Sequence, residues 1–250
     1  MKIFKSIKTW QVERNKTSKT IGFVPTMGAL HEGHLSLIKK SKKENKITIV
    51  SIFVNPTQFN DKKDLNNYPN TLEKDIKELK KMGTDYLIMP KYSEIYADNY
   101  TYKVSEDKLS KILCGSSRKG HFDGVLTIVM KLLNIAQADK AYFGEKDYQQ
   151  YVLIKKMAET FFMKTKIIGC KTIKEKDGLA KSSRNLLLTE KERKLAPNFY
   201  KILKTKKSVP EKMKSLIKLG FKIDYIEKHD DRIFGAVKLG KVRLIDNVKI

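Results

Sequence analysis

Cysteine and long apolar runs are both scarce in this sequence. Its 250 residues include two cysteines, Cys114 and Cys170, which lie far apart and in no metal-ligand motif. This usage fits a reduced cytoplasm and argues against a disulfide framework or a zinc site. No apolar run reaches about eighteen residues, and lysines interrupt residues 1–8, so neither a membrane span nor a signal peptide is expected. We therefore expect a cytoplasmic protein that does not bind a membrane.

Two common phosphate-binding sequences are also missing. Neither the dinucleotide fingerprint GxGxxG nor the Walker sequence GxxxxGK(S/T) occurs anywhere in the chain. Their absence excludes the two commonest phosphate cradles. A phosphate site in this chain must therefore be built from another sequence.

Negative charge is in short supply, because 28 acidic residues against 52 basic ones leave a net charge of +24. A basic face can neutralise the phosphates of a nucleic acid, so a nucleic-acid-binding protein is one alternative. The excess is spread along the whole chain, however, and no cluster of basic and aromatic residues stands out, so we expect no nucleic-acid partner. Only six of the 52 basic residues are arginine. Two of these, Arg118 and Arg184, fall in Gly- or Ser-rich loops, where a planar guanidinium can grip phosphate or carboxylate.

The segment Pro25 to His34 lies between an apolar run and a helical pattern. A strand that ends in a turn of small residues and opens a helix directs backbone N–H groups and the positive end of the helix dipole to one point, which suits a phosphate. Gly28 and Gly33 let the chain bend and approach a ligand. His31 and His34 place two imidazoles on one side of the helix start. An imidazole can donate a hydrogen bond to a phosphoryl oxygen, or a proton to a leaving group, near neutral pH.

Two other interpretations of these histidines are open. They could cap the helix or lie on the surface without a ligand. A metal site is disfavoured, because His121 and His229 are the remaining histidines and no carboxylate stands at a matching spacing. We expect no metal ligands among the side chains of this chain.

The first two thirds of the chain alternate between strands and helices. This pattern, with continuous apolar strands, predicts a doubly wound α/β domain with a Rossmann-like parallel sheet. The strands are predicted at residues 20–24, 47–54, 85–89, 140–143 and 166–170, and the helices at 35–45, 72–79, 125–136 and 148–162.

Beyond Cys170 the pattern changes. A polar loop at 177–185 precedes two predicted helices and three short strands, which together indicate a small α+β domain. The predicted helices cover 189–204 and 210–219, and the predicted strands 222–227, 233–239 and 242–245. We place the Rossmann-like domain at residues 1–171 and the small C-terminal lid domain at 172–250.

Three polar loops begin where predicted strands of the large domain end. They are Thr26 to His34, Asn55 to Phe59 and Gly144 to Gln150. Open α/β sheets bind ligands outside the carboxyl ends of their strands. The polar residues of all three loops are therefore expected to converge on one crevice.

The motifs of this chain, taken together, resemble the pantothenate synthetase family within the wider HxGH nucleotidyltransferase superfamily. The resemblance covers the whole chain and rests on several motifs in order, where HxGH alone would indicate only the superfamily. The matching segments are 25–34, Phe53-Val-Asn-Pro-Thr-Gln-Phe59, Gly120-His-Phe122, Phe143-Gly-Glu-Lys-Asp147, 177–185 and Arg243-Leu-Ile-Asp-Asn247.

The resemblance implies a two-step, ATP-dependent ligase. The carboxylate of pantoate would attack the α-phosphate of ATP to give pantoyl adenylate and pyrophosphate, and the amine of β-alanine would then displace AMP. ATP is thus expected as a substrate, with Mg²⁺ carried on its phosphates. The family further implies a cytoplasmic homodimer that acts in coenzyme A biosynthesis.

The resemblance also implies roles for individual residues. His31, His34 and Lys146 are expected to be catalytic, with His34 as a proton donor to the triphosphate. ATP is expected to contact Met27, Gly28, His31, His34, Gly144, Lys146, Asp147, Ile173, Lys181, Ser182, Ser183 and Arg184. Pantoate and β-alanine are expected to contact Met27, Asn55, Gln58 and Gln150. Loop capping is the alternative role for Asn55, because Asn often caps the loop after a strand.

Other positions carry weaker expectations. Arg118 and His121 are candidates near the site or at a dimer contact. Asp75 is expected to be an exposed helix carboxylate, with an outer contact to Mg²⁺ as the alternative. Lys181 stands where the family usually has Met or Leu, and the C-terminal part is shorter than the family usually has. A different HxGH nucleotidyltransferase is the second alternative, although it would have no reason to carry Gln58 and Gln150 in these loops.

Overall fold

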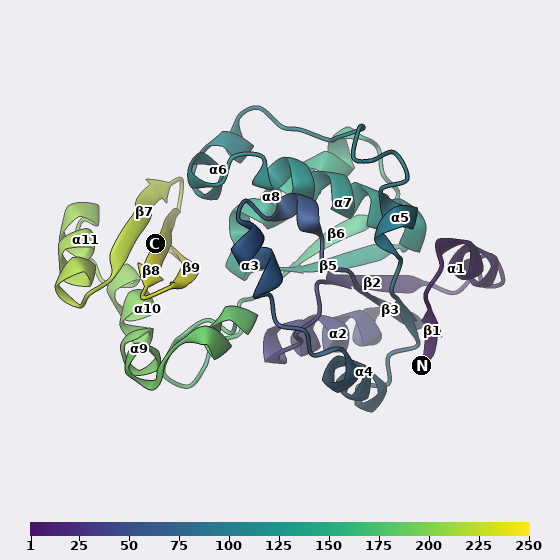
Figure 1. Ribbon diagram of the computed structural model, residues 1–250, viewed down its shortest axis with the longest axis horizontal. Helices are drawn as coiled ribbons and strands as arrows, with labels where there is room; N and C mark the ends of the chain where they lie inside the picture. The colour runs from purple at the N-terminus through teal and green to yellow at the C-terminus, as the bar shows by residue number, and fades with distance from the viewer.

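Six parallel strands form the main sheet of the computed structural model, which describes residues 1–250 (Figure 1). The strand order is β1-β4-β3-β2-β5-β6. After β1, which forms one edge, the chain places β3 and β4 on one side of β2 and then β5 and β6 on the other side. The strand order therefore reverses between β2 and β5. The strands are β1 (Lys2–Phe4), β2 (Ile21–Thr26), β3 (Ile47–Ile52), β4 (Tyr86–Ile88), β5 (Lys140–Gly144) and β6 (Lys166–Cys170).

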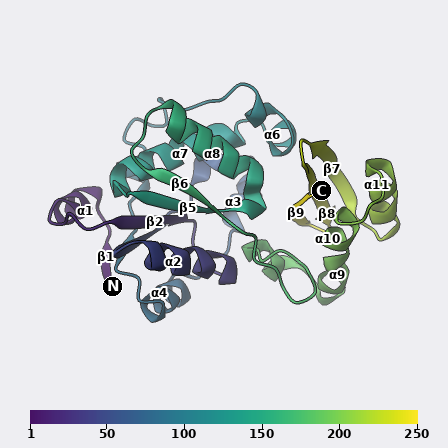
Figure 2. The same ribbon diagram turned by 180° about the vertical axis from the view of Figure 1, so that it is seen from behind.

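Helices cover both faces of this sheet, as Figures 1 and 2 show from opposite sides. Adjacent residues of one strand point to opposite faces, so Phe23 packs in the core under α7 and α8, while Val24 packs in the core under α2 and α4. This two-sided burial explains why the strands are continuous apolar runs. The helices are α1 (Ile7–Arg14), α2 (Glu32–Glu44), α4 (Leu72–Lys81), α7 (His121–Ala136) and α8 (Tyr148–Thr160), with short α3 (Lys62–Asn66), α5 (Tyr92–Ile95) and α6 (Cys114–Ser117).

A smaller body follows, with its own core and a three-stranded antiparallel sheet in the order β7-β8-β9. Phe199, Leu203 and Leu216 from its helices pack on this sheet. The predicted fold class, a Rossmann-like sheet with a small α+β domain, is confirmed. The elements are α9 (Glu190–Leu195), α10 (Pro197–Leu203), α11 (Val209–Lys218), β7 (Lys222–His229), β8 (Arg232–Leu239) and β9 (Val242–Lys249), and four 3₁₀ helices lie earlier in the chain: η1 (Pro56–Gln58), η2 (Leu109–Lys111), η3 (Glu145–Asp147) and η4 (Ser183–Leu187).

The prediction of one helix over 189–204 is wrong. Pro197 opens a new helix at its first position, since proline has no N–H to continue the helix before it. β1 and α1 were not predicted from the sequence. Trp10 of α1 is fully buried against Phe4 and Tyr86. No helix of the chain combines the length and apolar character needed to cross a membrane.

Candidate functional site

A cleft opens at the carboxyl ends of β2 and β5, where the strand order reverses. This is the place where doubly wound sheets bind ligands. The three strand-end loops and the 181–184 loop meet there. Of the residues with predicted site roles, all but Gly28 line the cleft: Met27, His31, His34, Asn55, Gln58, Gly144, Lys146, Asp147, Gln150, Ile173, Lys181, Ser182, Ser183 and Arg184.

The two histidines of the HxGH motif open helix α2. His31 is its N-cap, and its Nδ1 accepts a hydrogen bond from Gly33 N at 3.1 Å. The Nδ1 of His34 accepts from the backbone N of His31 at 3.3 Å. Since both Nδ1 atoms accept, the proton of each neutral ring lies on Nε2. Each histidine can therefore accept a capping hydrogen bond through Nδ1 and donate to a ligand through Nε2. The capping role and the ligand role are compatible.

Burial and nearby cations keep both rings neutral. Burial, followed by the charge of Lys146, lowers the pKa of His31 to about 4. Burial and the neighbouring His31 ring, whose centroid is 4.1 Å away, lower the pKa of His34 to about 3. At pH 7 the free protein thus presents two Nε2–H donors rather than two imidazolium ions.

Asp75 corrects the expectation of an exposed helix carboxylate. It is 2% exposed, and its oxygens accept from Ala29 N at 2.8 Å and Leu30 N at 2.9 Å. The loop bends there with positive φ at Gly28 (78°) and Ala29 (49°). Gly28 faces Asp75 instead of the cleft, since a Cβ on it would lie 3.1 Å from Asp75 Oδ2. Asp75 therefore holds the turn that leads into His31.

The Asp75→Asn variant is expected to lose about 1–3 kcal/mol of unfolding free energy, because its amide NH₂ would face a backbone N–H that needs an acceptor. Urea denaturation measures the change. Asp107→Asn is the matched control, since the Asp107 side chain is 90% exposed, and its effect is expected to stay within about 0.5 kcal/mol. Equal effects of the two variants would contradict the role assigned to Asp75.

Lys146 and Asp147 belong to η3, directly after β5. Their side chains approach each other, with Lys146 Nζ 3.4 Å from Asp147 Oδ2. Burial opposes ionisation of Asp147, yet the charge of Lys146 holds the pKa of this carboxyl below its usual value. Gly144 has no atom within 4 Å of an added Cβ. This leaves open space above the backbone at the end of β5.

The 177–185 loop is docked on the HxGH turn. Ser183 Oγ donates to Ala29 O at 3.2 Å. Lys181 Nζ lies 2.9 Å from Glu32 at the start of α2 and 2.7 Å from Glu175. Arg184 is held by an ion pair of 2.9 Å to Asp64 of α3. The loop thus closes one side of the cleft.

The residues predicted to bind pantoate differ in how many of their polar atoms already have a hydrogen-bond partner within the chain. Asn55 is 1% exposed, donates to Gly124 O at 3.2 Å and accepts from Tyr96 OH at 2.6 Å, which gives it the loop-capping role that was its alternative. Gln58 donates to Met27 Sδ at 2.8 Å. Gln150 makes no side-chain hydrogen bond within the chain, so its amide is available to a ligand.

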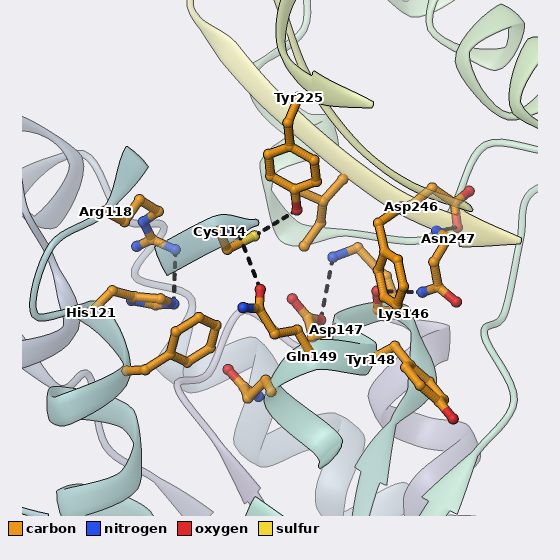
Figure 3. Close-up of a pocket in the computed structure, with 14 residues that line it drawn as sticks. Cys114, Arg118, His121, Lys146, Asp147, Tyr148, Gln149, Tyr225, Asp246 and Asn247 are labelled. Atoms are coloured by element: carbon orange, nitrogen blue, oxygen red, sulfur yellow. Dashed lines mark hydrogen bonds and ion pairs between the residues drawn. The ribbon is translucent and has the colours of Figure 1, made fainter. Parts of the chain in front are cut away.

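A second, small pocket lies between the two bodies and shares Lys146, Asp147 and Gln150 with the cleft. Figure 3 shows Arg118 and His121 on one side of it and β9 on the other. His121 Nδ1 donates to Gln58 O at 2.8 Å, while Arg118 lies 2.9 Å from His121 Nε2. Burial, and then Arg118, lower the pKa of His121 to about 3. These two residues thus lie near the site, as expected.

Asn247 makes a contact between the two bodies that was not predicted, although its motif, Arg243-Leu-Ile-Asp-Asn247, was noted. Its amide reaches from β9 to the backbone of η3, donating to Glu145 O at 2.8 Å and Lys146 O at 3.0 Å. No spacing in the sequence indicates this contact, because about a hundred residues separate the partners. Only the packing of the two bodies brings them together.

Comparison with known proteins gives one consistent result. A model of the family described as Pantoate-beta-alanine ligase matches residues 1–249. Pantothenate synthetase of Bdellovibrio bacteriovorus is 52% identical over 248 residues, which cover 99% of each chain. That of Legionella pneumophila is 48% identical over 249 residues, again covering 99% of each. Since the match spans nearly their full length, the expected shortening of the C-terminal part does not hold against these relatives.

Solved structures agree with these sequence matches. Pantoate-beta-alanine ligase from Francisella tularensis, complexed with beta-gamma ATP and beta-alanine, is 46% identical and superimposes with a TM-score of 0.96 over 100% of this chain and 97% of that chain. Pantothenate synthetase from Thermus thermophilus is 34% identical, with a TM-score of 0.90 over 100% and 99% of the two chains. Both bodies of the fold are therefore shared.

Proposed function

The chain belongs to the pantoate-beta-alanine ligase family, and on this premise we propose how its side chains divide the work of joining pantoate to β-alanine. The enzyme uses ATP as a substrate. A pantoate carboxylate oxygen bonds to the α-phosphorus, and the bond from that phosphorus to the β-phosphate breaks to release pyrophosphate. The β-alanine amine then bonds to the acyl carbon, loses a proton, and AMP leaves with the carboxyl oxygen.

The triphosphate binds at the start of α2. One observation carries this assignment: two neutral imidazoles, each with Nε2–H free, stand at a helix N-terminus in the cleft at the strand reversal. Backbone N–H groups and the helix dipole favour anions there. Charge that develops on the leaving pyrophosphate is stabilised by positioned donors. His31 and His34 supply those donors through Nε2–H. When the negative charge of the triphosphate raises the pKa of the His34 ring, the ring takes a proton at Nδ1 in place of the hydrogen bond from His31 N, and His34 is then a proton donor to the triphosphate at Nε2.

Lys146 and Asp147 hold the rest of the nucleotide. The ammonium of Lys146 contacts phosphate oxygens, and the Asp147 carboxylate accepts from the ribose hydroxyls. Gly144 admits the nucleotide close to the backbone, and Ile173 lies near the adenine. The 177–185 loop closes over the phosphates and keeps water from the adenylate. The residues that do so are Lys181, Ser182, Ser183 and Arg184.

Pantoate lies between Met27, Gln58 and Gln150. Neutral amides both donate and accept, as the hydroxyls and carboxylate of pantoate require. Met27 supplies the apolar wall against the dimethyl carbon. Asn55, whose amide is already bonded within the chain, contributes by holding the loop that carries Gln58.

Mg²⁺ arrives with the nucleotide in this proposal. No group of three or more His, Cys, Asp or Glu side chains could hold a metal ion by itself. Glu32 and Asp147 are paired with Lys181 and Lys146, and the oxygens of Asp75 accept from the backbone N–H groups of the turn. This donor set fits an ion whose ligands would be mainly phosphate oxygens and water, and such an ion would add positive charge where pyrophosphate leaves.

Three further features belong to this proposal. The enzyme works in the cytoplasm as a homodimer, in the synthesis of coenzyme A. Its two domains divide at residues 171 and 172, a boundary supported by the end of β6 at Cys170. The second domain then acts as a lid on the first.

The test is formation of AMP and pyrophosphate from ATP with pantoate and β-alanine supplied together and each omitted in turn. AMP release that requires both substrates is expected. ATP consumption with another acceptor, and none with pantoate, would contradict the substrate assignment while leaving the nucleotide site intact.

ATP binding is also expected to take up protons. In the free protein the pKa values of His31 and His34 are about 4 and about 3, and the triphosphate favours their charged forms, so the complex binds more protons than the free protein. ATP affinity should therefore rise as the pH falls toward these free-protein pKa values. Calorimetry in two buffers of different ionisation enthalpy measures the uptake. An uptake as large in His34→Asn as in the wild type would count against this coupling.

A further inference from the structure

Strand β9 of the small body lies against η3 and η4, the two turns that carry Lys146, Asp147 and Ser183. Figure 3 shows Asn247 directed from this strand toward the turn at Lys146. Asn247 is 9% exposed, so it is buried at the boundary of the two bodies. Its position makes it a direct link from the small domain to the backbone of the nucleotide turn.

Every polar atom of the Asn247 side chain has a partner. The NH₂ group donates to two consecutive carbonyls, Glu145 O at 2.8 Å and Lys146 O at 3.0 Å. The amide oxygen accepts from Arg232 Nη1 at 2.6 Å. A flipped amide would place its oxygen against two carbonyls and its NH₂ against a guanidinium, so the network allows one orientation.

The partners of Asn247 are themselves held in place. Arg232 lies with its guanidinium carbon 3.8 Å from the ring centroid of Tyr148, the residue that follows η3. Asp246 accepts from the backbone N of Asn247 at 2.9 Å and forms an ion pair with Lys174. The side-chain amide of Asn247 is thus held by Arg232 and its backbone by Asp246, while the amide donates to η3.

We propose that Asn247 is a positioning residue for the ligation reaction, which sets from the small domain the place of Lys146 and Asp147 in the nucleotide site. The inference rests on the roles proposed above for these two residues. The contact with η3 and Arg232 requires a short side chain that has two donors for the carbonyls of η3 and one acceptor for Arg232. Aspartate has no donor for the two carbonyls, and alanine reaches neither them nor Arg232.

The test compares Asn247→Asp with Asn198→Asp. Asn198 is the matched control, because its amide also donates to a backbone carbonyl, Leu195 O at 3.0 Å, but lies wholly within the small body. ATP affinity is measured by calorimetry, the KM for pantoate by the ligation assay, and the position of η3 by hydrogen exchange of residues 144–150.

Asn247→Asp is expected to weaken ATP binding by about 10- to 100-fold, since small misplacements of binding groups have effects of this size. The KM for pantoate should rise less, because Gln58 and Met27 come from other loops and only Gln150 follows η3. Exchange at 144–150 should speed up. Asn198→Asp should lose stability without these changes. If Asn247→Asp does not fold, Arg232→Gln should weaken ATP binding severalfold with the KM for pantoate little changed.

Two results would overturn the inference. One is an ATP affinity of Asn247→Asp, or of Arg232→Gln in its place, equal to that of the control. The other is an equal loss for ATP and pantoate, which indicates only a structural role. A wild-type protein that binds ATP but does not make AMP from pantoate and β-alanine would instead contradict the proposed function.

Discussion

His34→Ala is expected to lower kcat/KM for ATP by about 10²- to 10⁴-fold and to cost about 0.5–2 kcal/mol of stability. The variant removes a proton donor and an oriented N–H at the leaving pyrophosphate, and groups of this kind contribute factors of that size. His34 also belongs to the capping box of α2, because its Nδ1 accepts from the backbone N of His31. Single-turnover formation of pyrophosphate from ATP and pantoate measures the chemical step.

The control for His34→Ala is His229→Ala. His229 lies on β7, where it pairs with Glu227 at 2.8 Å, and its removal should leave kcat/KM within about twofold of the wild type. His31→Ala should lower both kcat/KM and stability, since it removes a donor to the triphosphate together with an N-cap contact that contributes about 0.5–2 kcal/mol. Full pyrophosphate release by His34→Ala would contradict the placement of the triphosphate at α2.

Gly124→Ala is expected to cost about 3 kcal/mol of stability and to raise the KM for pantoate at least about tenfold. A Cβ on Gly124 would lie 2.4 Å from Thr57 O and 2.8 Å from Gln58 N. These are backbone atoms of η1, which cannot move aside by changing a rotamer. The helix α7 and the loop that carries Gln58 must therefore separate. Denaturant unfolding and pantoate titration of the ligation rate measure the two effects.

Gly144→Ala gives the matched comparison. Its φ is −76°, and no atom lies within 4 Å of the added Cβ, so stability should hold or rise by about 0.4–1 kcal/mol. If the nucleotide approaches this backbone, ATP affinity should nevertheless fall. A stable Gly124→Ala with normal pantoate kinetics would show that η1 does not need its observed position.

The residues around the cleft could be predicted because their signals are local. His31, Gln58 and Lys146 each follow a continuous apolar strand, and parallel strands bring their carboxyl ends to one edge. Continuous apolar runs therefore predicted five of the six strands of the large sheet, and the rule for strand ends predicted the convergence of its loops. The resemblance in motifs then supplied the reaction, which no spacing of residues would have specified.

The supporting residues could not be predicted, because their roles arise from packing between distant segments. Asp75 sits in a charged helix like any surface carboxylate, and only the approach of the 28–30 turn buries it. Asn247 was part of a noted motif, yet its partners lie on the other body. Strand β1 has three residues in a lysine-rich stretch, which is too short for a period to be recognised.

The link between Asn247 and η3 also bears on how the protein is made. The ribosome completes Cys170, the last residue of the large sheet, about 75 residues before Asn247, or roughly 4 to 15 s earlier at ordinary rates of synthesis. The large sheet can therefore fold while its nucleotide turn still lacks the hydrogen bonds from β9. A nascent chain halted in this interval would carry every histidine of the HxGH motif and yet hold ATP poorly.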